Sequence, residues 1–211
     1  MSIIAGIAVP DSPLADRATQ MVRDTAPEFI FHHSSRVFLW GALQAEALRI
    51  EPDPELLYVA SMFHNLGLVP RYRTETQRFE MDGADEAAKF LEREGLDGAP
   101  VDTVWAAIAL HTTPEVPYAL DPVIAATAAG VETDVLGLHR HNLTASQVAA
   151  VVTAHPRRDF KNRILHAFTE GNEHRPDSTF GTINLDVLKH FIPGFVQPDF
   201  VETVRNSHWP E

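Results

Sequence analysis

The sequence predicts an all-α protein that forms one compact helical domain. Apolar residues recur at helical spacing in successive segments, and strand-like alternation is weak throughout. The 15 prolines fall mostly where one predicted helix gives way to the next. With 211 residues, of which 45% are hydrophobic, the chain can bury a substantial core. We therefore expect a single domain over residues 1–211, with its core at about 27–140 and further helices over 144–206 that pack on this core.

The first predicted helix carries an inward-facing histidine. Thr and Glu stand three residues apart in TAPE (25–28), the pattern of a capping box, and predict the start of a helix that runs to about Arg49. In the following FIFHHSSRVFLWGALQAEAL, His33 shares a face with Val37, Trp40 and Gln44. Because the helical period turns His32 roughly 100° away, His33 is the inward candidate.

The segment DPELLYVASMFHNLGLVP predicts a second helix that is almost entirely buried. Asp53 can cap the first free N–H groups, and Pro54 suits the first helical position because it has no N–H to lose. The residues that follow are almost all apolar or small, and we expect Gly67 to end the helix in a left-handed conformation. His64 and Asn65 then lie in the last turn, where free carbonyl groups favour a bound cation.

Three further segments complete the predicted core. A helix is expected from Asp82 or Gly83 to Gly95. In PVDTVWAAIALHTTP, the helical period places His111 on a buried, apolar stripe. DPVIAATAAGVETDVLG begins with another Asp-Pro pair and turns Asp134 inward, where a carboxylate requires a partner or a cation. Beyond the core, helices are expected at 144–155, 158–169, 185–191 and 199–206.

The composition excludes several classes of function. With a formal net charge of −12 and no Lys/Arg cluster longer than a pair, the chain lacks the basic surface that nucleic acid requires. No apolar run approaches the length of a membrane span, so no membrane partner is expected. Because cysteine is absent, any metal must rely on histidine and carboxylate ligands. We expect a cytoplasmic protein with a small-molecule substrate, and a homo-oligomeric state is compatible with the sequence.

Three inward histidines and one inward aspartate on four predicted helices indicate a shared site. Helical bundles build metal sites in this way, from single ligands that project from several helices towards one point. The alternative is that these side chains are hydrogen-bonded core residues, since sequence spacing gives no pairwise geometry.

The same residues resemble a known family. His33 in HSSRV, the pair His64-Asn65 in MFHNLG and Asp134 in VETDV resemble the H…HD…D pattern of the HD superfamily, all-helical metal-dependent hydrolases and related enzymes. The resemblance spans about 31–138, and DPELLYVASMFHNLG, RFEMDGAD and AIALHTTPE are similar to its cyanamide hydratase branch. It implies a divalent metal, zinc first with iron or manganese as alternatives, held by His33, His64 and Asp134, with residue 65 as the fourth ligand.

This chain departs from the family pattern at Asn65. An aspartate there would supply a charged oxygen, whereas the asparagine supplies a neutral amide oxygen. We expect weaker metal binding and an altered acidity of the water at the metal. Two interpretations stay open: an engineered substitution that traps an inactive complex, or a natural residue in a weakened enzyme or a non-catalytic binder.

Three more residues are candidates for substrate binding or catalysis. His111 is expected to contact the substrate as a catalytic group, with a packed core residue as the alternative, and Thr112 follows it at a helix end that can open onto a pocket. Glu80 is a candidate substrate or metal-supporting residue, or an acid that favours a helix start. No role is expected for Arg71, Arg73 and Arg78, or for seven histidines interpreted as surface residues: His139, His141, His155, His166, His174, His190 and His208.

The apolar segment after the His-Asn pair bears on the reaction. Phosphohydrolase members of the superfamily commonly carry a lysine where this chain has Leu68, and LGLVP suits a small uncharged substrate better than a nucleotide. The resemblance therefore implies hydration or hydrolysis of a nitrile-like compound, such as cyanamide to urea. The alternatives are a phosphohydrolase of a small phosphorylated metabolite or nucleotide, and a non-catalytic homologue that binds a small molecule.

Overall fold

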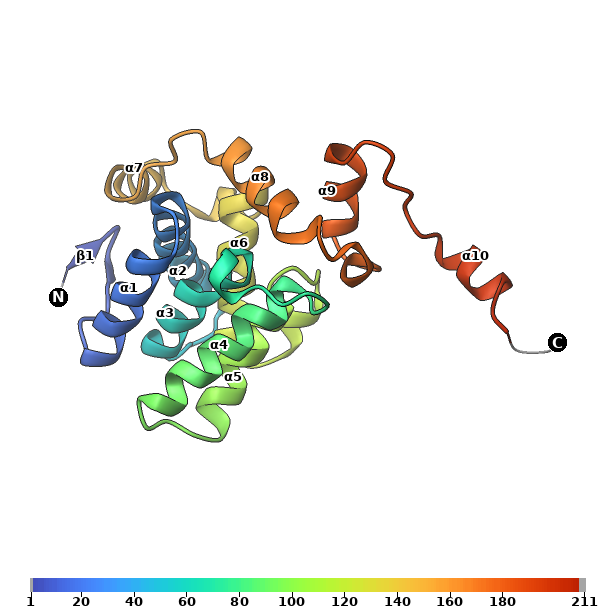
Figure 1. The fold of residues 1–211 in the computed structure, drawn as a ribbon. Coiled ribbons are helices and arrows are strands. Elements are labelled where there is room, and N and C mark those ends of the chain that lie inside the picture. Colours follow the sequence, from blue (N-terminus) through green and yellow to red (C-terminus); the bar gives the residue numbers. More distant parts are fainter. Residues whose placement is uncertain (1, 209–211) are drawn as a thin grey trace.

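Ten α-helices and one small β-hairpin make up the computed structural model, which describes residues 2–208 (Figure 1). The hairpin pairs β1 (Ile3–Ile4) with β2 (Ile7–Ala8). The helices are α1 (Pro13–Thr25), α2 (Glu28–Leu48), α3 (Pro54–Phe63), α4 (Phe79–Arg93), α5 (Ala99–Leu110), α6 (Pro122–Leu136), α7 (Ala145–Ala154), α8 (Phe160–Asn172), α9 (Asn184–Phe191) and α10 (Phe200–Arg205). Short 3₁₀ helices lie at η1 (Leu66–Leu68), η2 (Pro70–Tyr72), η3 (Val116–Ala119), η4 (Arg140–Asn142) and η5 (Pro176–Thr179). The predicted all-α class is thus confirmed.

Helix α2 is the centre of the bundle, and it packs most extensively against α6. Glycines allow the two backbones to meet. A Cβ atom added to Gly130 of α6 would lie 2.2 Å from the carbonyl oxygen of Val37, and one added to Gly41 of α2 would lie 2.5 Å from a carbonyl of α6. His33 lies one helical turn before Val37, and Asp134 one turn after Gly130, so this close contact brings the two together.

The end of α3 differs from the sequence prediction. Asp53 does cap the helix, because its carboxylate accepts hydrogen bonds from the next two free N–H groups. The helix ends at Phe63, however, and Gly67 lies within η1 without a left-handed conformation. Close packing explains the glycine instead, since a Cβ atom there would lie 1.9 Å from the carbonyl oxygen of Phe79. His64 is the C-cap residue of α3 and Asn65 is the N-cap residue of η1, so both side chains lie at the end of the helix.

The predicted helix that runs to about Arg49 is confirmed as α2, but its capping box is absent. Thr25 belongs to the end of α1, and its hydroxyl donates to the carbonyl of Met21. Helix α1 and the hairpin were not predicted at all. Helix α4 begins at Phe79, before the predicted start, because the ring of Phe79 is fully buried and fixes the first turn.

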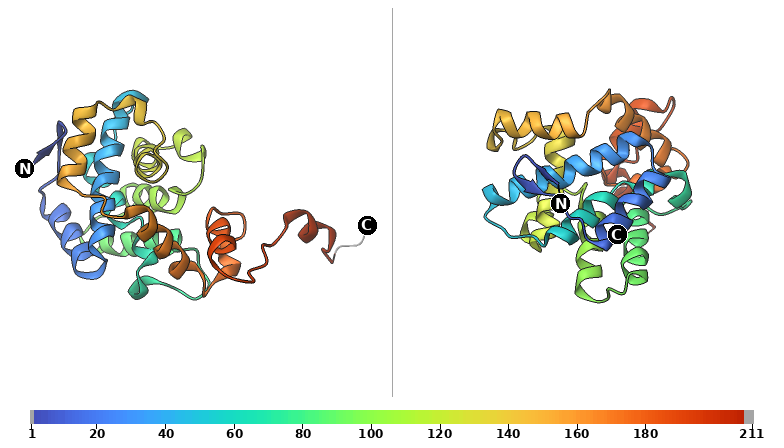
Figure 2. Two further views of the ribbon diagram at one scale, coloured as in Figure 1. Left: turned by 90° about the horizontal axis from the view of Figure 1, so that it is seen from above. Right: turned by 90° about the vertical axis from the view of Figure 1, so that its left-hand side faces the viewer.

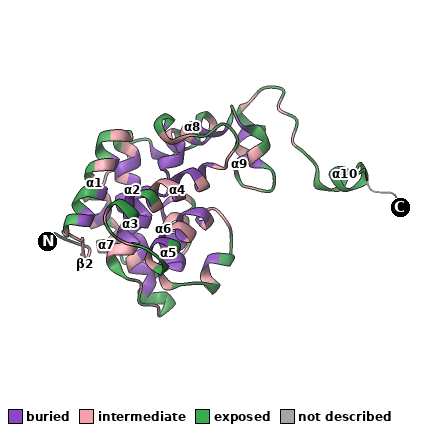
Figure 3. Ribbon diagram, turned by 60° about the horizontal axis from the view of Figure 1, so that its bottom comes forward, coloured by how far each residue is buried: buried purple, intermediate pink, exposed green. Residues whose placement is uncertain are grey.

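Of the helices after α6, α7 packs against α2 and β1, whereas α8 packs against α2 and η1 and contacts α9. Ile164 and Phe168 of α8 form an apolar cluster with Ile30, Leu68 and Phe79. Figures 1 and 2 show that the segment with α10 extends away from the rest of the molecule. Buried residues concentrate in α2, α3 and α6, whereas α10 is exposed along its length (Figure 3). Within residues 2–208, none of the helices is long and apolar enough to cross a membrane.

Candidate functional site

His33 and His64 face each other through their Nε2 atoms, which lie 3.1 Å apart in the buried core. Each ring is anchored by its other nitrogen. Nδ1 of His33 lies 2.7 Å from a carboxylate oxygen of Asp134, and Nδ1 of His64 lies 2.7 Å from the carbonyl oxygen of Ser61. Both anchors are acceptors, so each Nδ1 carries the hydrogen and donates it. In neutral rings, the two Nε2 lone pairs then point at each other, an arrangement that requires a proton or a cation between them.

Burial disfavours a proton in that position. It lowers the pKa of His64 well below its ordinary value, and the neighbouring His111 and His33 act in the same direction. Burial also lowers the pKa of His33, although the bond to Asp134 opposes the shift. Two neutral imidazoles with anchored Nδ1–H groups are the form in which histidines bind metals. The pair therefore fits a divalent cation.

Asn65, which lines the same cavity as His33 and His64, offers a further ligand atom for a metal. Its side-chain oxygen is buried and has no hydrogen-bond partner among residues 2–208, although buried polar atoms rarely lack one. No three His, Asp or Glu side chains in the described part of the chain are arranged to hold a metal ion. A cation at this point would thus be held by His33, His64 and the amide oxygen of Asn65. These three donors fit a divalent metal, but none of them carries a charge.

Asp134, which the sequence predicts as a metal ligand, is already fully bonded. Its oxygens accept hydrogen bonds from His33, from Arg36 at 2.8 and 2.9 Å, from Nε1 of Trp40 at 2.9 Å and from Arg157 at 2.6 Å. Burial alone would raise the pKa of this carboxyl, but the bonds from His33 and Arg36 hold it far below its usual range. The contacts therefore favour a role in orienting the His33 ring. Arg36, Trp40 and Arg157 were not predicted as partners of Asp134, although Arg36 lies one turn from His33.

His111 lies beside His64, with the ring centroids 4.9 Å apart. It is the C-cap residue of α5, and its Nδ1 donates to the carbonyl oxygen of Ile108 at 2.6 Å. Its Nε2 is therefore a bare acceptor in the neutral ring. Burial lowers the pKa of His111, and the negative charge of Glu80 opposes this shift.

Glu80 is buried behind Thr112 and does not line the cavity at the histidines. Its carboxylate accepts hydrogen bonds from Thr112 at 2.6 Å, Arg78 at 3.1 Å and Asn184 at 3.3 Å. Burial by itself raises the pKa of Glu80, but the Arg78 hydrogen bond and His111 lower it below its ordinary value. Arg78 is thus an ion-pair partner, and its interpretation as a solvated loop residue was wrong because Glu80 requires a cation.

A cavity of about 180 Å³ opens beside these groups. Its polar wall consists of His33, His64, Asn65, His111, Thr112, Thr113 and Glu132. Its other lining residues are apolar: Pro114, Val131, Val135, Leu136, Phe168 and Ile183. The structure therefore brings together five of the seven predicted site residues at one cavity, with Asp134 and Glu80 as buried neighbours of the histidines.

The HD domain family model matches residues 30–159, more than half of the chain. The chain belongs to the HD domain family. The match runs from the start of α2 to the segment after α7, so it covers His33, His64, Asn65 and Asp134. Membership implies a metal-dependent hydrolase that binds a divalent metal. No curated protein matches the chain.

Proposed function

We propose that this HD domain protein hydrates or hydrolyses a small, uncharged, nitrile-like substrate in the cavity beside His33 and His64. One observation supports this choice over others: among residues 2–208, no Lys or Arg lines the cavity, and its only charged lining residue is Glu132. An anionic substrate would meet no fixed positive charge there, whereas a small neutral molecule fits the apolar wall. Cyanamide, with urea as the product, is the specific candidate that the resemblance to the cyanamide hydratase branch offers.

The metal implied by the family would be held by His33, His64 and Asn65, with zinc as the first candidate. When bound, a divalent cation supplies a water nucleophile at neutral pH and polarises the substrate. Asp134 and the carbonyl of Ser61 hold the two imidazole rings so that their Nε2 atoms stay available. Because the amide of Asn65 is neutral, we expect this chain to bind metal less tightly than a homologue with aspartate at this position.

His111 is the proton carrier in this proposal. Its Nδ1–H is committed to the backbone, so Nε2 accepts the proton that water loses when its oxygen bonds to the substrate carbon. The same Nε2–H then returns the proton to the nitrogen of the nitrile-like group. Glu80 lies behind the ring, where its negative charge favours the protonated form of His111 during the transfer. Thr112 donates its hydroxyl hydrogen to Glu80 and keeps that carboxylate in place.

Family membership itself favours a second candidate, a phosphohydrolase of a small phosphorylated metabolite or nucleotide. The lack of Lys and Arg among the described residues that line the cavity at the histidines argues against this candidate. A third candidate, a non-catalytic small-molecule binder, rests on the neutral Asn65 alone.

The test compares metal-loaded protein and its Asn65→Asp variant on cyanamide and on nucleoside monophosphates. We expect turnover of cyanamide, faster in Asn65→Asp. In that background, His111→Gln should lower kcat/KM by roughly two to four orders of magnitude while the melting temperature and metal content stay nearly unchanged. His166→Gln, which changes an exposed histidine of α8, is the matched control and should keep full activity. Hydrolysis of nucleotides without action on cyanamide would favour the second candidate, and full metal loading without any turnover the third.

A further inference from the structure

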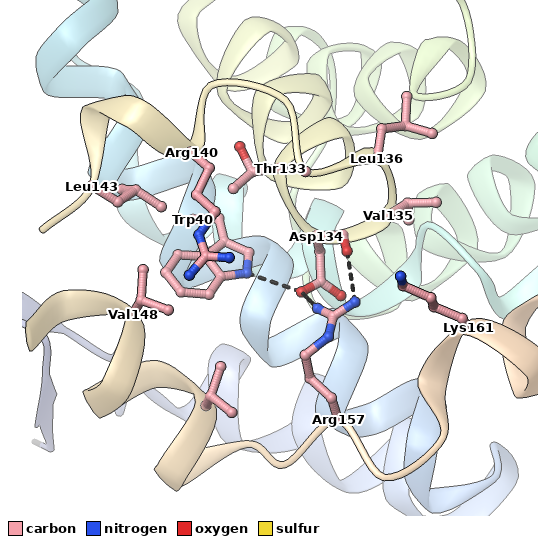
Figure 4. Close-up of a pocket in the computed structure, with 12 residues that line it drawn as sticks. Trp40, Thr133, Asp134, Val135, Leu136, Arg140, Leu143, Val148, Arg157 and Lys161 are labelled. Carbon is pink, nitrogen blue, oxygen red and sulfur yellow. Dashed lines mark hydrogen bonds and ion pairs between the residues drawn. The ribbon is translucent and has the colours of Figure 1, made fainter. Parts of the chain in front are cut away.

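A second cavity lies on the other side of the C-terminal turn of α6, with a volume of about 320 Å³ (Figure 4). Trp40 forms part of its wall, and Val148 and Val152 of α7 add aliphatic surface. Val135 and Leu136 line both this cavity and the one at the histidines, so a single helical turn separates the two. None of the four residues His33, His64, Asn65 and His111 lines the second cavity.

Three cationic side chains from separate segments line this cavity: Arg140 of η4, Arg157 of the loop between α7 and α8, and Lys161 of α8. Figure 4 shows the ends of Arg140 and Lys161 on opposite sides of the Asp134–Arg157 pair. Within residues 2–208, the side chains of Arg140 and Lys161 make no hydrogen bond or ion pair. Arg157 uses Nη1 and Nη2 on Asp134 and has further N–H groups left.

The local charge is opposite to that of the whole protein. The chain has a formal net charge of −12, yet Asp134 is the only acid that lines this cavity in the described part of the chain. Its single negative charge is already met by two guanidinium groups, those of Arg36 and Arg157. The positive charges of Arg140 and Lys161 are therefore left without compensation at the cavity. Such a cluster attracts an anion to this point while the rest of the surface repels it.

We propose that this cavity is a binding site for a small organic anion with an apolar body, separate from the cavity at the histidines. The anionic group, a carboxylate or a phosphate, is held by Arg140 and Lys161 and by the remaining N–H groups of Arg157. The apolar body packs on Trp40 and the valines of α7. This proposal does not depend on the reaction proposed above.

Calorimetric titration tests the site with three probes of similar body: benzoate, phenyl phosphate and the neutral benzyl alcohol. We expect at least one of the two anions to bind and benzyl alcohol to bind at least tenfold more weakly. The preferred anion then distinguishes a carboxylate ligand from a phosphate ligand. Equal affinity for benzyl alcohol would overturn the proposal, because it would show that the cationic side chains do not contribute to binding in this cavity. Absence of binding by both anions would overturn it too.

Variants locate the site. The double variant Arg140→Ala/Lys161→Ala should weaken anion binding at least tenfold. Lys89→Ala/Lys189→Ala removes the same amount of charge at exposed positions of α4 and α9, and should change the affinity less than twofold. All four side chains are exposed, so both proteins should keep the parent melting temperature. The His64→Gln variant should bind the anion as the parent does. Equal losses in both double variants, or loss of binding in His64→Gln, would overturn the assignment.

Discussion

Two buried polar clusters of this protein use their hydrogen-bonding groups in different ways. In one, Asp82 of α4 accepts hydrogen bonds from the backbone and hydroxyl of Thr74 and from Arg175. Arg175 also donates to four backbone carbonyls, those of Gly67, Thr74, Gln77 and Gly171. In the other cluster, Nε2 lone pairs face each other and an amide oxygen has no partner among the described residues.

The difference distinguishes a cluster that stabilises the fold from a cluster that can bind a ligand. Every group of Asp82 and Arg175 is used by the protein itself, so this pair ties the segment after α8 to α4 and η1. We propose that this tie makes the C-terminal helices part of the same folding unit as the HD domain. The cluster around His33 and His64 keeps acceptors that its own protein does not use. A buried acceptor without a partner is costly, and a bound cation would remove that cost.

The largest expected effect concerns the structural cluster. Arg175→Ala leaves the carboxylate of Asp82 buried without its cation, and should lower the free energy of unfolding by about 3–5 kcal/mol. Chemical unfolding measures this. Arg205→Ala, which breaks the exposed pair with Glu202, is the control and should change stability by less than about 1 kcal/mol. If Arg175→Ala lowers the free energy of unfolding as little as Arg205→Ala does, the segment with Arg175 is not part of the folding unit.

The second prediction sharpens the comparison at Asn65. Asn65→Asp adds a buried charge without a partner, so the metal-free variant should be less stable than the parent, by about 1–3 kcal/mol. Added zinc should reverse the order and raise the melting temperature above that of zinc-loaded parent, because a charged oxygen then meets a cation.

Asn184→Asp is the matched control for this variant. The side-chain oxygen of Asn184 is also buried without a partner among the described residues, but its amide donates to Glu80. The new carboxylate would therefore lie against another carboxylate, and zinc should not rescue it. If added zinc raises the melting temperature of both Asn65→Asp and Asn184→Asp, or of neither, the view that position 65 faces a cation is contradicted.

A smaller effect is expected for His155, which lies outside both clusters. Burial, together with the nearby charges of His32, Arg36 and Arg23, lowers its pKa to about 4. The unfolded chain, with an ordinary histidine pKa of about 6.5, then binds more protons between these two values, so stability falls as the pH falls from about 6.5 to 4. Since the ring is partly exposed, we expect a contribution of about 1 kcal/mol, or about 2–4 °C in the melting temperature. His155→Gln should flatten the pH profile of the melting temperature, and an unchanged slope would contradict the assignment.

Sequence reasoning succeeded where periodicity decides. The inward faces that carry His33 and His111 follow from helical spacing, the burial of His64 follows from the apolar run before it, and the motif order identified the family. It failed where tertiary contact decides. Nothing in the spacing places Arg157 on Asp134, because the arginine lies in a loop 23 positions away. The role of Gly67 likewise depends on a contact with Phe79 of another helix. His155 looked like a surface residue because its burial comes from packing near α2, which local sequence does not encode.

The central claim is that His33, His64 and Asn65 form an incomplete site that a divalent cation completes. Calorimetric titration of metal-free protein with zinc at neutral pH tests it most directly. We predict one binding event that releases no more than a small number of protons, because both rings are already neutral. His33→Gln and His64→Gln should each weaken it at least tenfold, while His166→Gln leaves it unchanged. Undiminished zinc binding in the His33→Gln/His64→Gln double variant, or no binding by the parent protein, would contradict the claim.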